Sequence, residues 1–211
     1  GEIEEVYGDA RLLEPIRKKP ESLRSPHAFY QKRFESMASE VPADAEDMSM
    51  AIFRMRSGIA VNWIMGIGGK TSITLQRICG DKGTIEGFGG RGDRVSMNLA
   101  GEEMSQEELL ESADGFALSP LEEHLFPTGI TADDSDVDGK IIAIEYHELA
   151  EAVLNGREVE VGGEEALKDV AALYAILESS LAGRAVKMEE VENCEVYSYQ
   201  AEIDDVLGIT S

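Results

Sequence analysis

Residues 47–65 read DMSMAIFRMRSGIAVNWIM, and this stretch decides the fold class. In its second half, Val61, Trp63 and Met65 alternate with side chains that would point to the opposite face. Alternation at a period of two, with β-branched and aromatic residues, predicts a strand. A similar run precedes Ser57-Gly58. Because glycine takes a positive φ without steric cost, this pair predicts a two-residue hairpin turn between two strands.

Two further strands are predicted downstream, at residues 72–79 and after the turn at residues 80–83, so that the four would form an antiparallel meander. Neither face of this sheet is wholly polar. We therefore expect helices of this chain to cover one face and another protein surface to cover the other. Strands early in the chain and helices late in it predict an α+β fold, with an open, mainly antiparallel β-sheet and helices packed on one face.

The length of the chain predicts the number of domains, and its net charge limits the kinds of partner that it can bind. The 211 residues favour a single domain over 1–211, with an irregular insertion at about residues 101–131 and a C-terminal tail at about residues 192–211. The formal net charge of −23 repels phosphate backbones and anionic lipid, so we expect no nucleic-acid and no membrane partner. We find no long apolar run and no secretory signal, and we expect a cytoplasmic protein.

A basic run interrupts this acidic chain between Pro15 and Pro42. One interpretation is a solvated loop with a short helix around residues 27–37. The other is a loop that presents side chains to an anionic or polyhydroxy ligand. The candidate ligand-binding side chains in this run are His27, Tyr30, Lys32 and Arg33. Trp63, the only tryptophan, has two interpretations as well: packing in a core or interface, or lining a ligand cleft.

Apolar residues at helical spacing predict two late helices, which end at Gly156 and Gly183. We expect their apolar stripes to carry much of the remaining core. The stripes consist of Ile142, Tyr146, Leu149 and Val153 in the first helix, and of Leu167, Val170, Tyr174, Leu177 and Leu181 in the second. Ser105 and Ser119 are predicted N-caps of two short helices. Residues 185–191 are predicted as a last strand, and the tail as a docked final helix.

Two glycine-rich segments resemble nucleotide-binding motifs, and neither fits its context. Residues 87–92 match G-x-G-x-x-G, but a dinucleotide fingerprint needs a helix directly after it. Residues 94–99 alternate like a strand instead, so a glycine-rich hairpin turn is the better interpretation. Residues 66–71 resemble a phosphate-binding loop, but Ile64 stands where that motif needs its first glycine. We therefore expect no cofactor-binding residues in this chain.

Residues 134–145 match the pattern of a calcium loop. Its carboxylate ligands would be Asp134, Asp136, Asp138 and Glu145. The alternative, which we favour, is a solvated acidic segment that caps the following helix, because Pro127 and Gly129 break the helix that should enter such a loop. On this interpretation the chain holds no metal.

Five segments, in this order, resemble the C-terminal domain of the Gfo/Idh/MocA oxidoreductases. They are the opening strand at residues 1–8, the central hairpin at 46–63, a G-x-x-G-T hairpin at 78–85, and the closing helices at 145–156 and 163–184. The resemblance spans nearly the whole chain apart from the insertion near residues 101–131. It implies a dihydrodipicolinate-reductase-like C-terminal domain.

The resemblance also implies a two-domain enzyme. In this family an N-terminal Rossmann domain binds NAD or NADP, and hydride passes between nicotinamide and a sugar or sugar-like alcohol. The family's catalytic Lys lies in the Rossmann domain, and its Asp and His lie on a helix before the strand that opens this chain. No catalytic residue is therefore expected here, and the fragment alone should bind no nicotinamide and catalyse nothing.

The implied role is the substrate-binding and oligomerisation domain, with His27, Tyr30 and Trp63 in the wall of the sugar cleft. The implied partners are the chain's own N-terminal Rossmann domain, a small polyol or sugar substrate, and further copies in a homo-dimer or tetramer through the open sheet face. Because the chain lacks an initiator Met, we expect it to be a piece of a longer protein. The alternatives are a free-standing, non-catalytic dimerisation module and a calcium-binding module.

Overall fold

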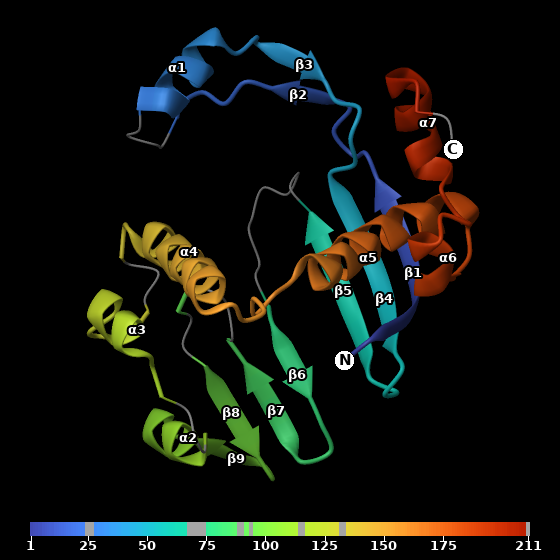
Figure 1. Cartoon of the computed structure of the whole chain (residues 1–211). Helices are drawn as coiled ribbons and strands as arrows, with labels where there is room; N and C mark the ends of the chain where they lie inside the picture. Colours follow the sequence, from blue (N-terminus) through green and yellow to red (C-terminus); the bar gives the residue numbers. More distant parts are fainter. Residues whose placement is uncertain are drawn as a thin grey trace. The chain divides into compact units, whose positions relative to one another are not determined.

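The computed structural model describes residues 1–23, 28–66, 75–87, 91–92, 95–113, 117–130 and 134–209. They form two compact units, residues 1–70 with 163–211 and residues 71–162, and each unit is treated by itself. Antiparallel sheets and helices occur in both, so the predicted α+β class is confirmed (Figure 1).

The first unit is built on an antiparallel sheet with the strand order β10–β1–β4–β5. Its strands are β10 (Val186–Lys187), β1 (Ile3–Arg11), β4 (Met48–Met55) and β5 (Ala60–Gly66). The predicted hairpin is the pair β4–β5, and the predicted first strand is β1. The sequence pattern around Trp63 therefore identified the pair β4–β5 of this sheet correctly, with β5 as its edge strand among the described residues.

The hairpin turn is one residue longer than predicted. The Met55 amide donates a hydrogen bond to the Ile59 carbonyl oxygen at 2.8 Å, which closes a three-residue loop, residues 56–58. Gly58, the last loop residue, has a φ of 87°. A three-residue hairpin loop places its last residue in the left-handed region, which glycine tolerates best. The glycine was correctly identified as the reason for the turn, but the length of the turn was wrong.

The register assigns each side chain of the sheet to one of two faces, because paired residues in an antiparallel ladder point the same way. The rows on one face are Val6–Phe53–Val61 and Gly8–Ala51–Trp63, and a row on the other is Tyr7–Ile52–Asn62. Helix α5 (Gly163–Ala182) packs on the first face, where Val6, Ala51 and Phe53 are buried. We call the face with Tyr7 the open face.

Helix α5 buries its small side chains, so the predicted core stripe is wrong. Its buried residues are Ala171, Ala172, Ala175, Ile176, Glu178 and Ser179, whereas Leu167 is 66% exposed. A Cβ placed on Gly8 would lie 2.6 Å from the carbonyl oxygen of Ile176. The helix thus comes so close to β1 that there is no room for a side chain on Gly8. Ile176 is the one large apolar side chain of α5 among its buried residues, whereas Leu167, Val170, Leu173 and Leu181 are exposed.

Serines of α5 also satisfy the backbone of β1 beyond the end of β10. Strand β10 pairs only with Glu5 and Val6. Farther along β1, the Gly8 amide donates to Ser179 Oγ at 2.9 Å, and the Ala10 amide donates to Ser180 Oγ at 3.0 Å. Buried amides need such partners. The helix therefore replaces a neighbouring strand along this part of the sheet.

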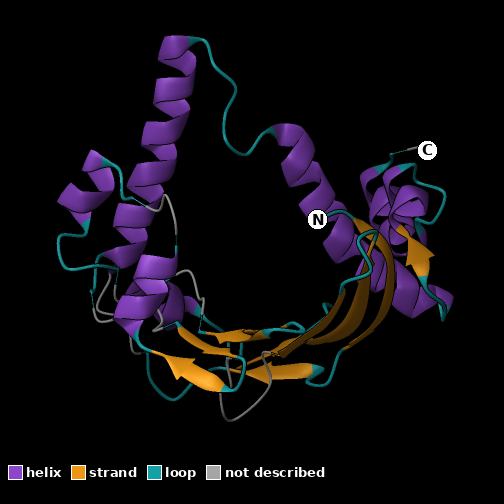
Figure 2. Ribbon diagram, turned by 90° about the horizontal axis from the view of Figure 1, so that it is seen from below, coloured by secondary structure: helices purple, strands orange, loops and turns teal. Residues whose placement is uncertain are grey.

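Three other parts complete the first unit. An arm between β1 and β4 consists of β2 (Ile16–Lys18), α1 (Ala28–Ser36) and β3 (Glu40–Pro42), so the predicted short helix is confirmed and the two-strand ribbon was missed. Helices α6 (Met188–Glu192) and α7 (Ser198–Leu207) pack against α5, near the C-terminus in Figure 2. The strand predicted at residues 185–191 ends at Lys187, because the Glu190 side chain accepts from the Lys187 amide and starts a helix.

The second unit contains an antiparallel sheet with the order β6–β7–β8–β9. Its strands are β6 (Arg77–Cys79), β7 (Gly83–Glu86), β8 (Ser96–Leu99) and β9 (Glu102–Met104). The predicted G-x-x-G-T hairpin is the pair β6–β7. A Cβ on Gly83 would lie 2.0 Å from the Asn98 carbonyl oxygen, so this strand approach requires glycine. The pairing expected between the second and third meander strands falls partly on residues 67–74, outside the described residues.

The helices of the second unit are α2 (Gln106–Ser112), α3 (Pro120–Leu125) and α4 (Val137–Asn155). Both predicted N-caps are confirmed, since Ser105 and Ser119 each form a capping box. The insertion is therefore more regular than expected. In α4 the buried residues are Val137 and Ala152, while the predicted apolar stripe from Ile142 to Val153 is exposed. The end of α4 at Gly156, in the left-handed conformation, agrees with the prediction.

Candidate functional site

Trp63 lies on β5, on the same face of the sheet as α5 but beyond the strands that the helix covers. The residue paired with it is Ala51, whose small side chain leaves room for the indole. The indole Nε1–H donates to Ser49 Oγ at 3.3 Å, and the residue remains 37% exposed. Val61 and Met65, two positions away on either side, share this face and are exposed. β5 thus presents an aromatic and apolar stripe, which we call the β5 stripe (Val61, Trp63, Met65).

The β5 stripe has the chemistry of a sugar-binding or domain-contacting surface. A half-exposed indole offers a π face on which a sugar ring or an apolar side chain can stack. Its N–H is held by Ser49, which fixes the direction of the ring. The side chain of Trp63 is partly exposed and lies outside the buried core, so the interpretation as a core residue is wrong. Packing in an interface and lining of a ligand cleft both stay predictions.

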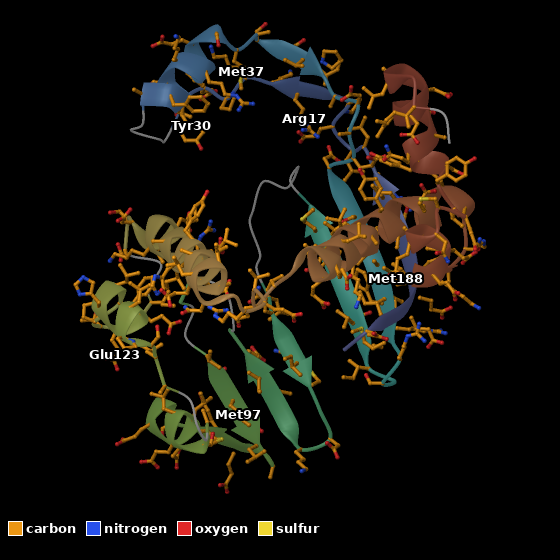
Figure 3. All side chains as sticks on the ribbon, in the orientation of Figure 1. Arg17, Tyr30, Met37, Met97, Glu123 and Met188 are labelled. Carbon is orange, nitrogen blue, oxygen red and sulfur yellow. The ribbon has the colours of Figure 1, made fainter. Side chains whose placement is uncertain are left out.

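The other two predicted wall residues belong to the arm. Tyr30 lies on α1, where its ring meets that of Phe29 edge to face at a centroid distance of 5.3 Å (Figure 3). His27 lies outside the described residues. The concavity of the described residues that includes Trp63 is not lined by any described residue of α1. The convergence of the three side chains on one ligand therefore stays a prediction.

Hydrogen bonds tie the base of the arm to the sheet. The buried carboxylate of Asp47 accepts from the Leu13 amide at 2.7 Å and from the Glu14 amide at 2.8 Å. These backbone donors lower the pKa of Asp47. The Asp47 amide in turn donates to the Arg11 carbonyl oxygen at 3.0 Å. One side chain thus connects the start of β4 with the point where the arm leaves β1.

A second contact connects the tail to the entrance of β4. The Tyr199 hydroxyl on α7 donates to Glu46 Oε2 at 2.9 Å. Burial, with a further contribution from this hydrogen bond and the Glu46 charge, raises the pKa of Tyr199 to about 12. The phenol is therefore held in its protonated form and serves as a structural donor.

The basic run of the arm is largely engaged within the arm and its base. Arg17 donates to the Ala45 carbonyl oxygen at 3.3 Å, Lys18 pairs with Glu40 at 3.8 Å, and Lys19 lies 4.5 Å from the centroid of the Phe34 ring. These exposed contacts are weak individually. The positions of three basic side chains are therefore explained by contacts within the chain, and no ligand is needed to explain them.

The acidic segment before α4 forms ion pairs of its own. Asp134 pairs with Lys140 at 2.7 Å, and Asp138 accepts from Arg91 at 2.7 and 3.1 Å. Helix α4 begins at Val137, so Asp138 and Glu145 already lie within it, whereas a calcium loop wraps its ligands around the ion before the helix is established. Asp136 occupies the N-cap position, but its side chain makes no capping hydrogen bond. Instead, Asp134 accepts from the Asp136 amide at 3.0 Å.

The remaining sites that the sequence suggested are the two glycine-rich motifs, a metal site and a membrane-spanning helix. Gly87 and Gly92 flank a connection between the antiparallel strands β7 and β8, as expected for a glycine-rich hairpin. The central glycines of that motif, and residues 67–74 of the second one, lie outside the described residues. Among the described residues, no group of three or more His, Cys, Asp or Glu side chains could hold a metal ion. None of the described helices is both long and apolar enough to cross a lipid bilayer.

Residues of α5 that sequence reasoning missed organise much of the first unit. Ser179 contacts both β1 and the Arg184 carbonyl oxygen, and Glu178 is buried beside α7. A signal was present in the sequence. Ala171, Ala175 and Ser179 recur every four residues and form a small-residue stripe on the face opposite the large apolar one.

Comparison with known families agrees with this architecture. A family model described as "Oxidoreductase family, C-terminal alpha/beta domain" matches residues 18–188. No curated protein matches the sequence.

Several solved structures share the fold. Levoglucosan dehydrogenase in complex with NADH and L-sorbose gives a TM-score of 0.57 at 18% identity, over 90% of this chain and 47% of that chain. An oxidoreductase from Agrobacterium radiobacter in complex with NAD+, L-tartaric acid and magnesium gives 0.55 at 15% identity, over 90% and 44%. Aldose-aldose oxidoreductase from Caulobacter crescentus complexed with glycerol gives 0.51 at 20% identity, over 88% and 41%. The chain spans less than half the length of each.

Proposed function

This chain belongs to the Gfo/Idh/MocA oxidoreductase family, as its C-terminal α/β domain, and from this premise we propose that it forms the substrate-side wall and the subunit contact of an NAD(P)-dependent oxidoreductase. Its substrate class would be a sugar or a sugar-like alcohol. We also propose that the two compact units form one domain over residues 1–211, since the matched region, residues 18–188, includes parts of both.

The observation that supports the proposal is that the two faces of the first sheet present different exposed surfaces. The β5 stripe, with the oriented indole of Trp63, lies on the face that α5 only partly covers. The open face carries Tyr7, Ile52 and Ile64, all exposed. A substrate wall and a subunit contact can therefore coexist, because they use opposite sides of the same strands.

Nicotinamide would be held by a separate N-terminal Rossmann domain. The glycine-rich segment at residues 87–92 does not match a dinucleotide fingerprint, because the next described element is the strand β8 and not a helix whose N-terminal amides could meet a pyrophosphate. Support for the partner domain comes from the relatives, one of which carries NADH with L-sorbose in a chain of which the match covers 47%. In this proposal Trp63, Tyr30 and His27 orient the sugar, and the catalytic groups lie outside this chain.

The test uses the two-domain protein that this proposal expects. We expect a glycine-rich βαβ unit in the reading frame before Gly1, and we expect the purified protein to reduce NAD+ or NADP+ with a sugar alcohol as donor. Trp63→Ala should raise the KM for the sugar by about three- to tenfold, since an aromatic contact contributes about 0.5–1.5 kcal/mol. Trp63→Phe, which keeps an aromatic face, should recover most of the loss. The KM for the nicotinamide should stay unchanged in both variants.

One result would exclude this function, and another would exclude only the role of Trp63. A start codon at residue 1 with no dinucleotide-binding domain would favour the free-standing interaction module. An active full-length enzyme whose sugar KM ignores Trp63→Ala would remove Trp63 from the wall, while the family assignment would stand.

A further inference from the structure

The arm between β1 and β4 has no buried residue in its described part. From Pro15 to Pro42, every described side chain is exposed or half-buried. Helix α1 makes no extensive contact with any other described helix or strand. A short helix and a two-stranded ribbon are marginal in water unless they pack against something larger. The arm therefore needs a surface that the described residues of its own copy do not supply.

The charge of the arm is opposite to that of the rest of the chain. Residues 15–42 contain six of the 19 basic residues but only three of the 42 acidic ones, so the arm carries +3 and the rest −26. Surfaces of opposite charge attract each other and fix the register of a contact. A second copy of this chain is therefore a partner that the arm attracts, whereas the rest of the chain repels nucleic acid and anionic lipid.

One face of α1 combines an aromatic ring with two positive charges. Lys32 and Arg33 follow Phe29 by three and four residues, so the three side chains share a face of the helix. Phe29 is 68% exposed. Lys32 and Arg33 are exposed too, and no ion pair between described residues includes either of them. This face can therefore insert a ring into an apolar groove with acidic residues at its edge.

Helices α5, α6 and α7 form such a groove, which opens to solvent and has a volume of about 230 Å³. The apolar side chains that line it are Leu167, Val170, Tyr174, Val191, Val196 and Tyr197. An apolar cavity of about 150 Å³ holds benzene in an engineered protein, so a phenylalanine ring fits here.

The edge of the groove is acidic. Glu192 lines it, Glu195 follows three residues later, and both are exposed. Neither belongs to an ion pair of the described residues, and no described Lys, Arg or His lines the groove. The groove therefore complements the α1 face in both apolar surface and charge.

We propose that the arm docks on a second copy of this chain. The Phe29 ring enters the groove between α5, α6 and α7 of that copy, and Lys32 and Arg33 pair with its Glu192 and Glu195. About a two-fold axis each copy supplies one arm and one groove, so the contact occurs twice. This contact goes beyond the proposed oxidoreductase function, because it needs no nicotinamide and the groove shares no lining residue with the concavity that includes Trp63.

The first experiment cross-links the arm to the groove in the full chain. In a Cys79→Ser background, Cys194 lines the groove, and Ser36→Cys adds a thiol on the α1 face of Phe29, seven residues further on. A short bismaleimide should join two copies, and mass spectrometry should find residue 36 linked to residue 194. Glu35→Cys, on another side of α1, is the matched control and should give this product several-fold more slowly.

The second experiment reverses the charges in the Ser36→Cys chain. Lys32→Glu with Arg33→Glu (the arm variant) and Glu192→Lys with Glu195→Lys (the groove variant) should each slow the cross-link by about tenfold or more, because like charges would then meet. An equal mixture of the two variants should recover the rate. General repulsion predicts the opposite for the groove variant, whose net charge is less negative.

Phe29→Ala tests the apolar part of the contact without changing any charge. It should also slow the cross-link by about tenfold, as expected for an aromatic side chain at the centre of an interface. Because no described arm residue is buried, the arm variants should keep the fold, which circular dichroism checks.

A cross-link between copies that is lost in both charge variants and recovered in their mixture supports the proposal. A link between residues 36 and 194 of one copy, equal rates with Glu35→Cys, or charge variants that react like the natural pair would overturn it. Absence of any link between copies would also overturn it, as expected if the arm packs on another part of a longer protein.

Discussion

At the scale of single residues, a few polar side chains of the first unit satisfy backbone groups that are distant in sequence. Ser179 is fully buried, accepts from the Gly8 amide and donates to the Arg184 carbonyl oxygen at 2.6 Å. Asp47 accepts from two amides at the base of the arm. Removing such a side chain leaves a buried backbone group unpaired, and this costs more than the hydrogen bond itself contributes.

Ser179→Ala should therefore lower the free energy of unfolding by about 1–3 kcal/mol, because the Gly8 amide would lose its acceptor in a buried place. Urea unfolding followed by circular dichroism measures the change. Ser180→Ala is the matched control, since its hydroxyl serves the Ala10 amide in a partly exposed position and should matter less. Equal effects of the two variants would show that burial does not distinguish these serines.

Glu190 should give the protein a measurable acid dependence. The Arg184 guanidinium donates to both of its carboxylate oxygens at 2.7 and 3.1 Å, and with the Lys187 amide it lowers the pKa of Glu190 to about 2. Because the folded pKa lies below the ordinary value of 4.5, the stabilisation is complete above 4.5 and disappears as the pH falls toward 2.

Thermal unfolding as a function of pH tests this dependence. Glu190→Gln should lower the Tm near neutral pH, and the difference from the natural chain should shrink below pH 4.5. Glu189→Gln changes the same charge in the same turn of α6 and should leave the dependence in place. A Tm difference that stays constant down to pH 2 would mean that Arg184 does not hold the carboxylate ionised.

At the scale of elements, the contact between α5 and β1 positions both the β5 stripe and the groove between α5, α6 and α7. The backbone of Ile176 lies against Gly8 of the strand, so the two backbones approach closely. Leu167, Val170 and Tyr174 lie on another side of α5, where they line this groove with residues of α6 and α7. One close contact thus decides which face of the helix is available for binding.

Gly8→Ala should destabilise the first unit by about 1–3 kcal/mol or more, as expected when a methyl group is forced into a packed contact. Its Cβ would lie 2.6 Å from a backbone oxygen that has no flexible side chain to yield. Gly66→Ala in β5 is the control, because the nearest atom to its Cβ would be 3.9 Å away. Differential scanning calorimetry of both variants measures the effect; if Gly8→Ala is as well tolerated as Gly66→Ala, the helix does not lie as close as the structure has it.

At the scale of the whole molecule, the open face of the first sheet is the surface that most resembles an unfilled interface. Tyr7, Ile52 and Ile64 are exposed on it. Exposed apolar side chains in a contiguous area are typical of protein–protein contacts. The net charge of −23 would oppose association, so an apolar contact must supply the attraction.

Ile64→Glu should therefore shift the chain from dimer or tetramer toward monomer. Ile64 is 74% exposed, so the new charge costs little in the monomer but would be buried in the contact. Sedimentation velocity over a range of concentrations measures the shift. Val61→Glu introduces the same charge on the opposite face of β5 and should leave the association unchanged. A natural chain that stays monomeric at high concentration would exclude this contact.

The sequence by itself determined the features that depend on neighbours within a few residues. Alternation around Trp63 predicted β5, Gly58 marked the hairpin, and Ser105 and Ser119 marked helix starts, because strand pleating, left-handed turns and capping boxes are local effects. The ordered set of such signals was also enough to indicate the family.

Only the tertiary structure decided which side of α5 is buried. The size of its apolar side chains favoured burial of the α5 stripe that includes Leu167. The contact with β1 is made instead by the side that includes Ser179, whose hydroxyl accepts a hydrogen bond from the Gly8 amide, 171 residues away in sequence. The tertiary structure also ended the last strand at Lys187 and buried Glu178 beside α7, where it accepts from the Tyr199 amide. The physical reason is that the space left between two backbones depends on both of them, and the periodicity of one segment carries no information about how closely the other will approach.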